Sequence, residues 1–206
     1  MFVTEIIPLD KKKRKICTDS GYMFPLYLSE IRKFHITEDS EISEHCLEEI
    51  NELLFKRVCN RMLFLLGDTD KSSYELKNKL ASSGYPSEII ENAITSLKKY
   101  GYVDDVRYAR SYIEASVNNK GRSRIDIVNR LSVKGIPRNV IDEVMEEFEF
   151  DNTELIERAL RKRGYSLSEV ALSDYNTKAK LYRYLSGKGF SSTDISKVFS
   201  IYSDWQ

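Results

Sequence analysis

The sequence contains few of the residues on which enzyme and metal sites depend. Only two histidines, His35 and His45, occur among 206 residues, and neither belongs to a recognisable set of zinc ligands or to a nucleophilic triad. The chain also lacks a glycine-rich phosphate-binding loop, because residues 120–123 hold a single glycine with no strand before them. We therefore predict that the protein is not an enzyme and that it binds no metal and no cofactor.

Long apolar runs are missing as well. No stretch approaches the roughly 18 apolar residues that cross a bilayer, and residues 1–8 lack the charged and apolar regions of a secretion signal. The cysteines are odd in number and have no close pairing of the zinc or redox kind: Cys17, Cys46 and Cys59. Such thiols are typical of a reducing compartment. We expect a cytoplasmic protein with no membrane contact.

Helix-breaking residues are scarce, with four prolines and nine glycines, whereas 41% of the residues are hydrophobic and 31% are charged. This composition favours a folded helical protein with a polar surface. Beyond about residue 46 the apolar residues follow helical spacing, in pairs repeated every fourth position. Three segments share this rhythm and are predicted first helices of three modules: 54–63, 108–113 and 155–160.

A glycine motif then marks the end of each predicted second helix. In each copy a leucine is followed four positions later by glycine and then by an apolar residue: Leu80–Gly84–Tyr85, Leu131–Gly135–Ile136 and Leu185–Gly189–Phe190. A left-handed glycine just past a helix, with an apolar contact across it, is the Schellman motif. The motif predicts the ends of three second helices. Third helices are predicted to follow, over about 89–97, 140–148 and 195–202.

The glycines are 51 and 54 residues apart, so one unit has about fifty residues and three helices. Short helices need a packed partner face, and neighbouring units can stack as they do in solenoids. We predict an all-α fold of three tandem three-helix repeats in an elongated, curved molecule. The predicted boundaries are 46–104, 105–152 and 153–206, after an N-terminal extension over 1–45.

The extension has a different pattern. Short runs with β-forming residues at 3–8, 14–18 and 22–28 predict a small hairpin-like structure. The basic run 11–15 lies between the first two. The favoured interpretation is an exposed turn that aids solubility, and the alternative is a finger that contacts phosphates.

The net charge is zero, but the charges are segregated. Residues 107–138 hold eight basic and two acidic residues, and 142–154 hold seven acidic residues and no basic one. Helical phasing points six of these cations outward, which suits phosphates or an acidic protein surface: Arg107, Arg110, Lys120, Arg122, Arg130 and Lys134. Arg124 is phased nearer the apolar side.

One acidic pair, Asp104–Asp105, precedes a predicted helix. We favour a capping role at the helix N-terminus, where a carboxylate accepts unpaired N–H groups. A hydrolase or nuclease that uses the pair is an alternative, but it requires a divalent metal and a further ligand.

Several segments together resemble the bacterial RecX recombination regulators. They are Gly101–Tyr102–Val103–Asp104–Asp105–Val106–Arg107–Tyr108–Ala109, Lys120–Gly121, Leu131–Ser132–Val133–Lys134–Gly135–Ile136, Ser73–Tyr74–Glu75–Leu76, Lys79–Leu80 and Gly84–Tyr85. The resemblance covers residues 46–206 and is weakest in the third module. It implies three tandem three-helix repeats in a bent, right-handed molecule. It also implies binding within the groove of the RecA–DNA filament and inhibition of strand exchange, ATP hydrolysis and co-protease activity.

The resemblance further implies weaker, direct contact with DNA. Arg107 and Lys134 match motif positions, whereas the other four cations rest on charge and helix phase alone. We expect a monomer that regulates the filament. The runner-up is a stand-alone DNA-binding protein with helix-turn-helix-like units, although a net charge of zero argues against tight binding by the chain alone.

Overall fold

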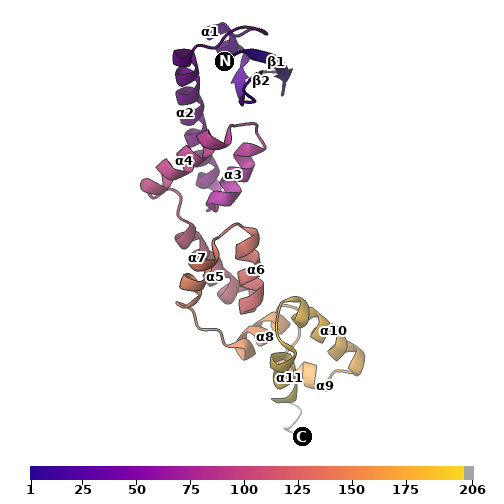
Figure 1. Cartoon of the computed structure of the whole chain (residues 1–206). Coiled ribbons are helices and arrows are strands. Elements are labelled where there is room, and N and C mark those ends of the chain that lie inside the picture. The colour runs from indigo at the N-terminus through magenta and orange to yellow at the C-terminus, as the bar shows by residue number, and fades with distance from the viewer. Residues whose placement is uncertain (202–206) are drawn as a thin grey trace. The chain divides into compact units, whose positions relative to one another are not determined.

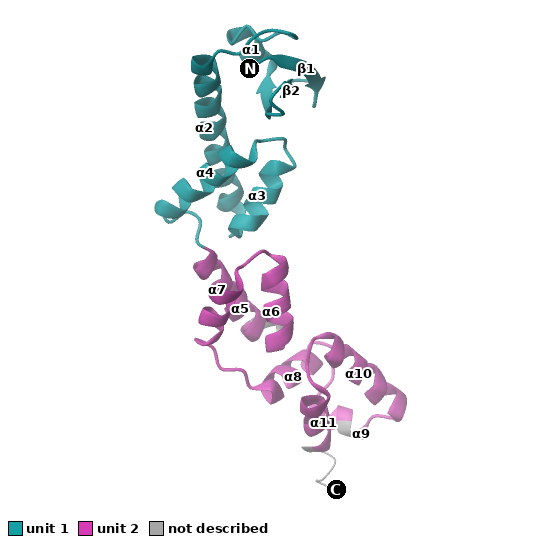
Figure 2. Cartoon of the chain, in the orientation of Figure 1, with its two compact units in different colours: residues 1–104 teal, residues 105–206 magenta. Residues whose placement is uncertain are grey.

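The computed structural model describes residues 1–201, apart from the side chains of 119, 120, 171 and 201 (Figure 1). Over these residues the chain forms eleven helices and one three-stranded sheet. The predicted all-helical architecture with a small N-terminal β structure is confirmed. The chain divides into two compact units, Met1–Asp104 and Asp105–Gln206 (Figure 2). Within the described range, no helix has both the length and the apolarity needed to cross a membrane.

The first unit begins with an antiparallel sheet of strand order β1-β2-β3, formed by β1 (Val3–Pro8), β2 (Lys13–Thr18) and β3 (Met23–Tyr27). A short helix, α1 (Leu28–Lys33), follows β3. The three runs of β-forming residues thus became three strands rather than a single hairpin. On one face of the sheet, Ile16 pairs with Ile6 and Phe24, and both Ile16 and Phe24 are fully buried.

The long helix α2 (Glu44–Asp68) joins this sheet to the first module. The buried side chains of α2 belong to one apolar cluster that includes Phe24 of the sheet and Leu76 of the next helix. Polar contacts add to the junction, since the Tyr22 hydroxyl donates to Asn51 Oδ1 at 2.9 Å. Arg57 donates to the carbonyl of Pro25 at 3.3 Å and forms a salt bridge with Glu30. The extension and the first module therefore share a single core.

The first module is completed by α3 (Ser73–Ala81) and α4 (Ser87–Lys99). Ser72 caps α3, because its hydroxyl accepts from the Glu75 N–H while the Glu75 carboxylate accepts from the Ser72 N–H. The apolar face of α4 recurs at helical spacing and is buried from Ile89 to Leu97. The turn between α3 and α4 contains Gly84.

The second unit contains the other two modules. The second module consists of α5 (Asp105–Lys120), α6 (Arg124–Val133) and α7 (Arg138–Met145). The third consists of α8 (Asn152–Arg161), α9 (Leu167–Leu172), α10 (Tyr175–Gly187) and α11 (Ser192–Ile201). The short helix α9 was not expected from the sequence, so the third module has four helices. Tyr202, which was expected on the last helix, lies outside the described residues.

The glycine motif has the geometry expected of it. Gly84, Gly135 and Gly189 have positive φ angles of 84°, 73° and 81°. The N–H of the following apolar residue bonds back to the leucine carbonyl in all three copies, at 3.4, 3.1 and 3.3 Å. These leucines and the apolar partners are buried. The repeated motif therefore ends α3, α6 and α10 in the same way.

Candidate binding surface of the second module

The six predicted cations, which we call the second-module surface, lie on α5, on α6, in the loop between these helices (Arg122) and at the residue that follows α6 (Lys134). Tyr108, Ala109 and Ile113 of α5 face the core, so Arg107 and Arg110 lie on the exposed side. The side chain of Lys120, at the end of α5, lies outside the described residues. The structure describes the other five, and it places them in different environments.

Arg110 is anchored to an acidic residue. Its Nε and Nη2 donate to the two carboxylate oxygens of Glu147 at 2.7 and 2.6 Å, a bidentate pair that ties α5 to the residues after α7. The hydrogen bonds from Arg110 lower the pKa of Glu147 below its ordinary value. Arg110 stays 47% exposed, so its guanidinium is oriented but still accessible.

Asp126 gathers two more of the cations. Its carboxylate accepts from Arg122 Nη1 at 2.9 Å and from Arg130 Nε at 2.8 Å. Arg130 is 49% exposed, but the Arg122 side chain is only 17% exposed, and its Nε is buried without a hydrogen-bond partner. The expected outward position therefore does not hold for Arg122, whose side chain is mostly buried and pairs with Asp126.

Lys134 lies beside two aromatic rings. Its Nζ is 5.5 Å from the ring centre of Tyr108 and 5.8 Å from that of Tyr112, and the two rings stack with centres 6.4 Å apart. Arg124, which was phased toward the apolar side, is exposed and lies 5.7 Å from the ring of Phe150. Arg124 is thus exposed near the second-module surface, although helix phase placed it nearer the apolar side.

The start of α5 offers little support for a hydrolase. Asp105 is the first residue of this helix and is mostly buried, where its charge is favoured by the helix dipole. Among the described residues, no group of three or more histidine, cysteine, aspartate or glutamate side chains is arranged to hold a metal ion. The Asp104–Asp105 pair thus has no visible set of further ligands in that part of the chain.

The second module is joined to the third by contacts that the sequence did not predict. Arg158 of α8 donates through Nη1 to the carbonyls of Val117 and Asn118 at 2.9 and 2.8 Å, and so satisfies the C-terminal end of α5. The Ser123 hydroxyl donates to the carbonyl of Lys188 at 2.8 Å. These bonds connect residues about 40 and 65 positions apart, which no local pattern encodes.

Gly121 makes this close approach possible. Its φ is +52°, and a Cβ at this position would lie 2.9 Å from the Leu155 carbonyl oxygen and 3.0 Å from the Ala159 nitrogen. Both contacts are with backbone atoms of α8, which cannot rotate away as a side chain can. The second and third modules are therefore packed backbone to backbone at this point.

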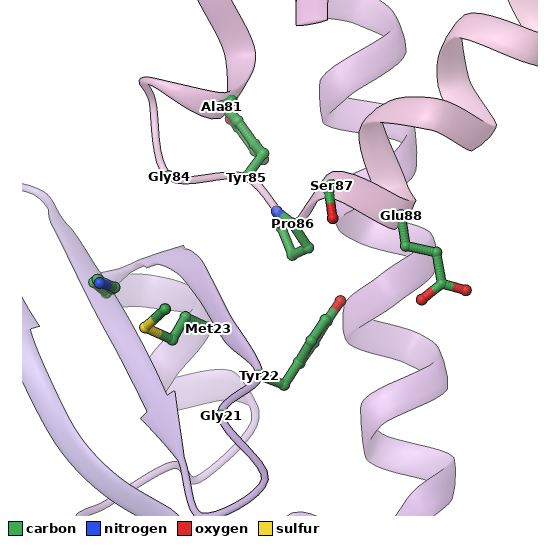
Figure 3. Close-up of a pocket in the computed structure, with 10 residues that line it drawn as sticks. Gly21, Tyr22, Met23, Ala81, Gly84, Tyr85, Pro86, Ser87 and Glu88 are labelled. Atoms are coloured by element: carbon green, nitrogen blue, oxygen red, sulfur yellow. The ribbon is translucent and has the colours of Figure 1, made fainter. Parts of the chain in front are cut away.

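The first unit contains a cleft of about 460 Å³ between the sheet and the α3–α4 turn (Figure 3). Tyr22 and Met23 line one side of it, and Tyr85, Pro86 and Glu88 line the other. Its lining includes one basic side chain, Lys15, and one carboxylate, Glu88.

Tyr22 should make the first unit less stable at high pH. Burial, with a smaller contribution from the Glu88 charge, raises the pKa of Tyr22 from 10.0 to about 12. The folded state therefore keeps the phenol proton where the unfolded state loses it, and stability should fall as pH rises through this interval. Urea unfolding should show that the free energy of unfolding falls less with rising alkaline pH in Tyr22→Phe than in the wild type. Identical pH dependence in both proteins would contradict the assignment.

Three family models match the chain, one for each module. They describe the first, second and third three-helix domains of RecX and match residues 60–97, 104–145 and 150–199. The third module, where the sequence resemblance was weakest, is thus matched as well.

Curated relatives extend the similarity into the N-terminal extension. The chain is 31% identical to regulatory protein RecX of Clostridium acetobutylicum, over 95% of this chain and 94% of the relative. It is 30% identical to regulatory protein RecX of Finegoldia magna, over 97% of this chain and 98% of the relative.

Solved structures agree in fold. A crystal structure of regulatory protein RecX matches with a TM-score of 0.59 at 24% identity, over 98% of both chains. RecX from Lactobacillus salivarius matches with a TM-score of 0.59 at 22% identity, over 73% of this chain and 97% of that one. At these identities the matches support the three-helix architecture.

Proposed function

Because the chain belongs to the RecX family of regulatory proteins, we propose that it is a non-enzymatic regulator that binds the RecA–DNA filament and inhibits the recombinase. The observation that carries the proposal is family similarity over the length of the chain, through all three modules. The proposed partner is cytoplasmic, and a monomer of this chain would act on it there during DNA repair and recombination, including the SOS response.

The second-module surface supports this proposal chemically. A RecA–DNA filament is a large polyanion coated with protein, so it can offer both phosphates and acidic side chains to cations. Arg110 and Arg130 are half exposed and are held in place by Glu147 and Asp126. A held guanidinium loses less conformational entropy when it binds, which favours a specific contact over a diffuse one.

The same ion pairs weigh against the runner-up function. A stand-alone DNA-binding protein needs a strong local excess of positive charge. Here Glu147 offsets Arg110, and Asp126 is shared between Arg122 and Arg130, within a chain of net charge zero. We therefore propose that direct DNA contact supplements the filament contact.

ATP turnover by RecA provides the test. Added to filaments preformed on single-stranded DNA, the chain should slow ATP hydrolysis progressively, with saturation at or below one chain per RecA. The inhibition should persist when free single-stranded DNA is added in excess. Relief by excess DNA would instead support sequestration by a stand-alone DNA-binding protein, and unchanged turnover at every ratio would contradict both functions.

A further inference from the structure

The turn between β1 and β2 carries a concentrated run of positive charge that the proposed function does not use. Residues 11–15 are all lysine or arginine; residues 11–12 lie in the β1–β2 turn, and 13–15 are the first three residues of β2. The turn is well defined by hydrogen bonds, since the Leu9 N–H bonds to the Lys13 carbonyl at 3.1 Å. It lies in the first unit, whereas the second-module surface lies in the second.

Asp10 organises the turn. Its Oδ1 accepts from the N–H groups of Lys12 and Lys13 at 2.7 and 2.8 Å. These backbone hydrogen bonds, together with the nearby charges of Lys13 and Arg14, lower the pKa of Asp10 below its ordinary value. An aspartate that binds its own backbone two or three residues on is a common turn device. The carboxylate that stands closest in sequence to the basic run is therefore bound to main-chain groups.

Two of the five cations also help to build the structure. Arg14 donates through Nη1 to the carbonyls of Asp10 and Lys13 at 2.8 and 2.9 Å, which closes the turn from the side. The Lys13 ammonium lies 5.0 Å from the ring centre of Tyr27 on β3. Both residues are partly buried. Their side chains account for the shape of the turn.

The other three cations have no such internal role. Lys11 and Lys12 are exposed, and Lys15 is partly buried and lines the cleft beside β2. In the part of the chain that the structure describes, none of the three has an acidic side chain within the 4 Å of an ion pair. Lysines that only increase solubility do not require an ordered backbone. Here the hydrogen bonds of Asp10 and Arg14 hold the β1–β2 turn in one conformation.

We propose that the β1–β2 turn is a nucleic-acid contact in which Lys11 and Lys12 bind backbone phosphates, with Lys15 adding charge behind them. Lysine ammonium groups bind phosphate as point charges and read no bases, so the contact is independent of sequence. A turn that is ordered before binding lowers the entropic cost of placing two charges together. This contact requires no recombinase, and it rests on one part of the function proposed above, because it gives the supplementary DNA contact a location in the first unit.

Salt-dependent binding to a labelled single-stranded oligonucleotide, with no RecA present, tests this inference. The variant is Lys11→Gln/Lys12→Gln, which leaves Asp10 and Arg14 in place. If two phosphate contacts are lost, the slope of log affinity against log salt should become shallower by roughly 1.4, at about 0.7 per contact on single strands. On duplex DNA the corresponding change is roughly 1.8, so parallel titrations show on which form of DNA the variant loses its contacts.

The matched control is Lys33→Gln/Lys56→Gln. These two lysines are exposed in the same unit and border a shallow hollow that also contains Glu49 and Glu52. The control removes the same net charge and should leave the slope close to that of the wild type. Circular dichroism should show equal helicity in all three proteins.

Two outcomes would overturn the inference. Equal slopes for the turn variant and the control would show that Lys11 and Lys12 act only through net charge. Unchanged binding to both nucleic acids, with weaker capture on RecA filaments, would assign the turn to a protein partner. Since the binding titration contains no recombinase, a failure of the filament proposal would leave its result unaffected.

Discussion

Neutralising four cations of the second-module surface should weaken capture of the chain on RecA–DNA filaments by about tenfold or more. The variant carries glutamine in place of Arg107, Arg110, Arg130 and Lys134. Exposed ion pairs contribute roughly 0.2–1 kcal/mol each, so four of them at about 0.4 kcal/mol give about 1.6 kcal/mol, slightly more than the roughly 1.4 kcal/mol that corresponds to tenfold. Cosedimentation with filaments on single-stranded DNA measures the effect directly.

Glutamine is preferred to glutamate here for a structural reason. Glutamate at position 110 would stand beside Glu147, and glutamate at 130 beside Asp126, so repulsion within the chain would confuse loss of binding with loss of stability. Arg122 is left unchanged because its side chain is mostly buried.

A second variant with four exposed cations neutralised elsewhere separates position from net charge: Lys33, Lys56, Arg183 and Lys197. It should be captured nearly as well as the wild type. If both variants lose capture equally, the filament responds to overall charge and the second-module surface is not the contact. If neither loses capture while helicity is unchanged, the contact lies elsewhere on the chain.

Gly121→Ala should destabilise the second unit by about 2–4 kcal/mol. A non-glycine residue in the left-handed region costs roughly 1–2 kcal/mol. The new Cβ would in addition meet the Leu155 oxygen and Ala159 nitrogen of α8, so the helix or the turn must shift. A shift would weaken the hydrogen bonds from Arg158 to the end of α5, and losses of this kind are typically about 1 kcal/mol each.

Gly187→Ala provides a control of opposite sign. Gly187 ends α10 in the same unit, and a Cβ there would have no heavy atom within 4 Å. Alanine is a better helix former than glycine, so stability should be unchanged or raised by up to about 1 kcal/mol. Urea unfolding followed by circular dichroism measures both variants. Equal stability of Gly121→Ala and Gly187→Ala would show that the α5–α8 junction is not tightly packed.

The parts of the fold that follow from local spacing could be predicted from the sequence. The three glycine motifs are local, because leucine, glycine and the apolar residue lie within six positions, and each ended its helix as expected. The helix α9 was missed although its signals are also local. Ser166 and Glu169 form a capping box. Gly164 follows Leu160, and Gly101 follows Leu97, with the same spacing and positive φ as the three glycines of the motif. The fifty-residue repeat predicts three helices in each module, and α9 is an additional helix that the other two modules lack.

The surface was less predictable than the fold. Helix phase correctly predicted that Arg107, Arg110 and Arg130 are exposed. Arg122 and Arg130 each lie four residues from Asp126, so their pairing with it also follows from the sequence. In contrast, the Arg110–Glu147 pair and the position of Lys134 near Tyr108 depend on how α5, α6 and α7 pack. The low exposure of Arg122 was also not evident from helix phase, because this residue lies in the loop before α6, next to the close contact of Gly121 with α8. The spacing of apolar residues describes one helix at a time, so it does not predict which side chains of different helices come into contact.

The length of α2 has a practical consequence for dissecting this protein. A shortened chain that starts at residue 46 would keep most of α2 but lose the strand residues that share its buried cluster, together with the Tyr22 hydroxyl that binds Asn51. Such a fragment would expose the apolar face of α2 to water, so it should self-associate or precipitate. Experiments that assign activities to separate pieces are better cut between Asp104 and Asp105, where each piece keeps its own interior.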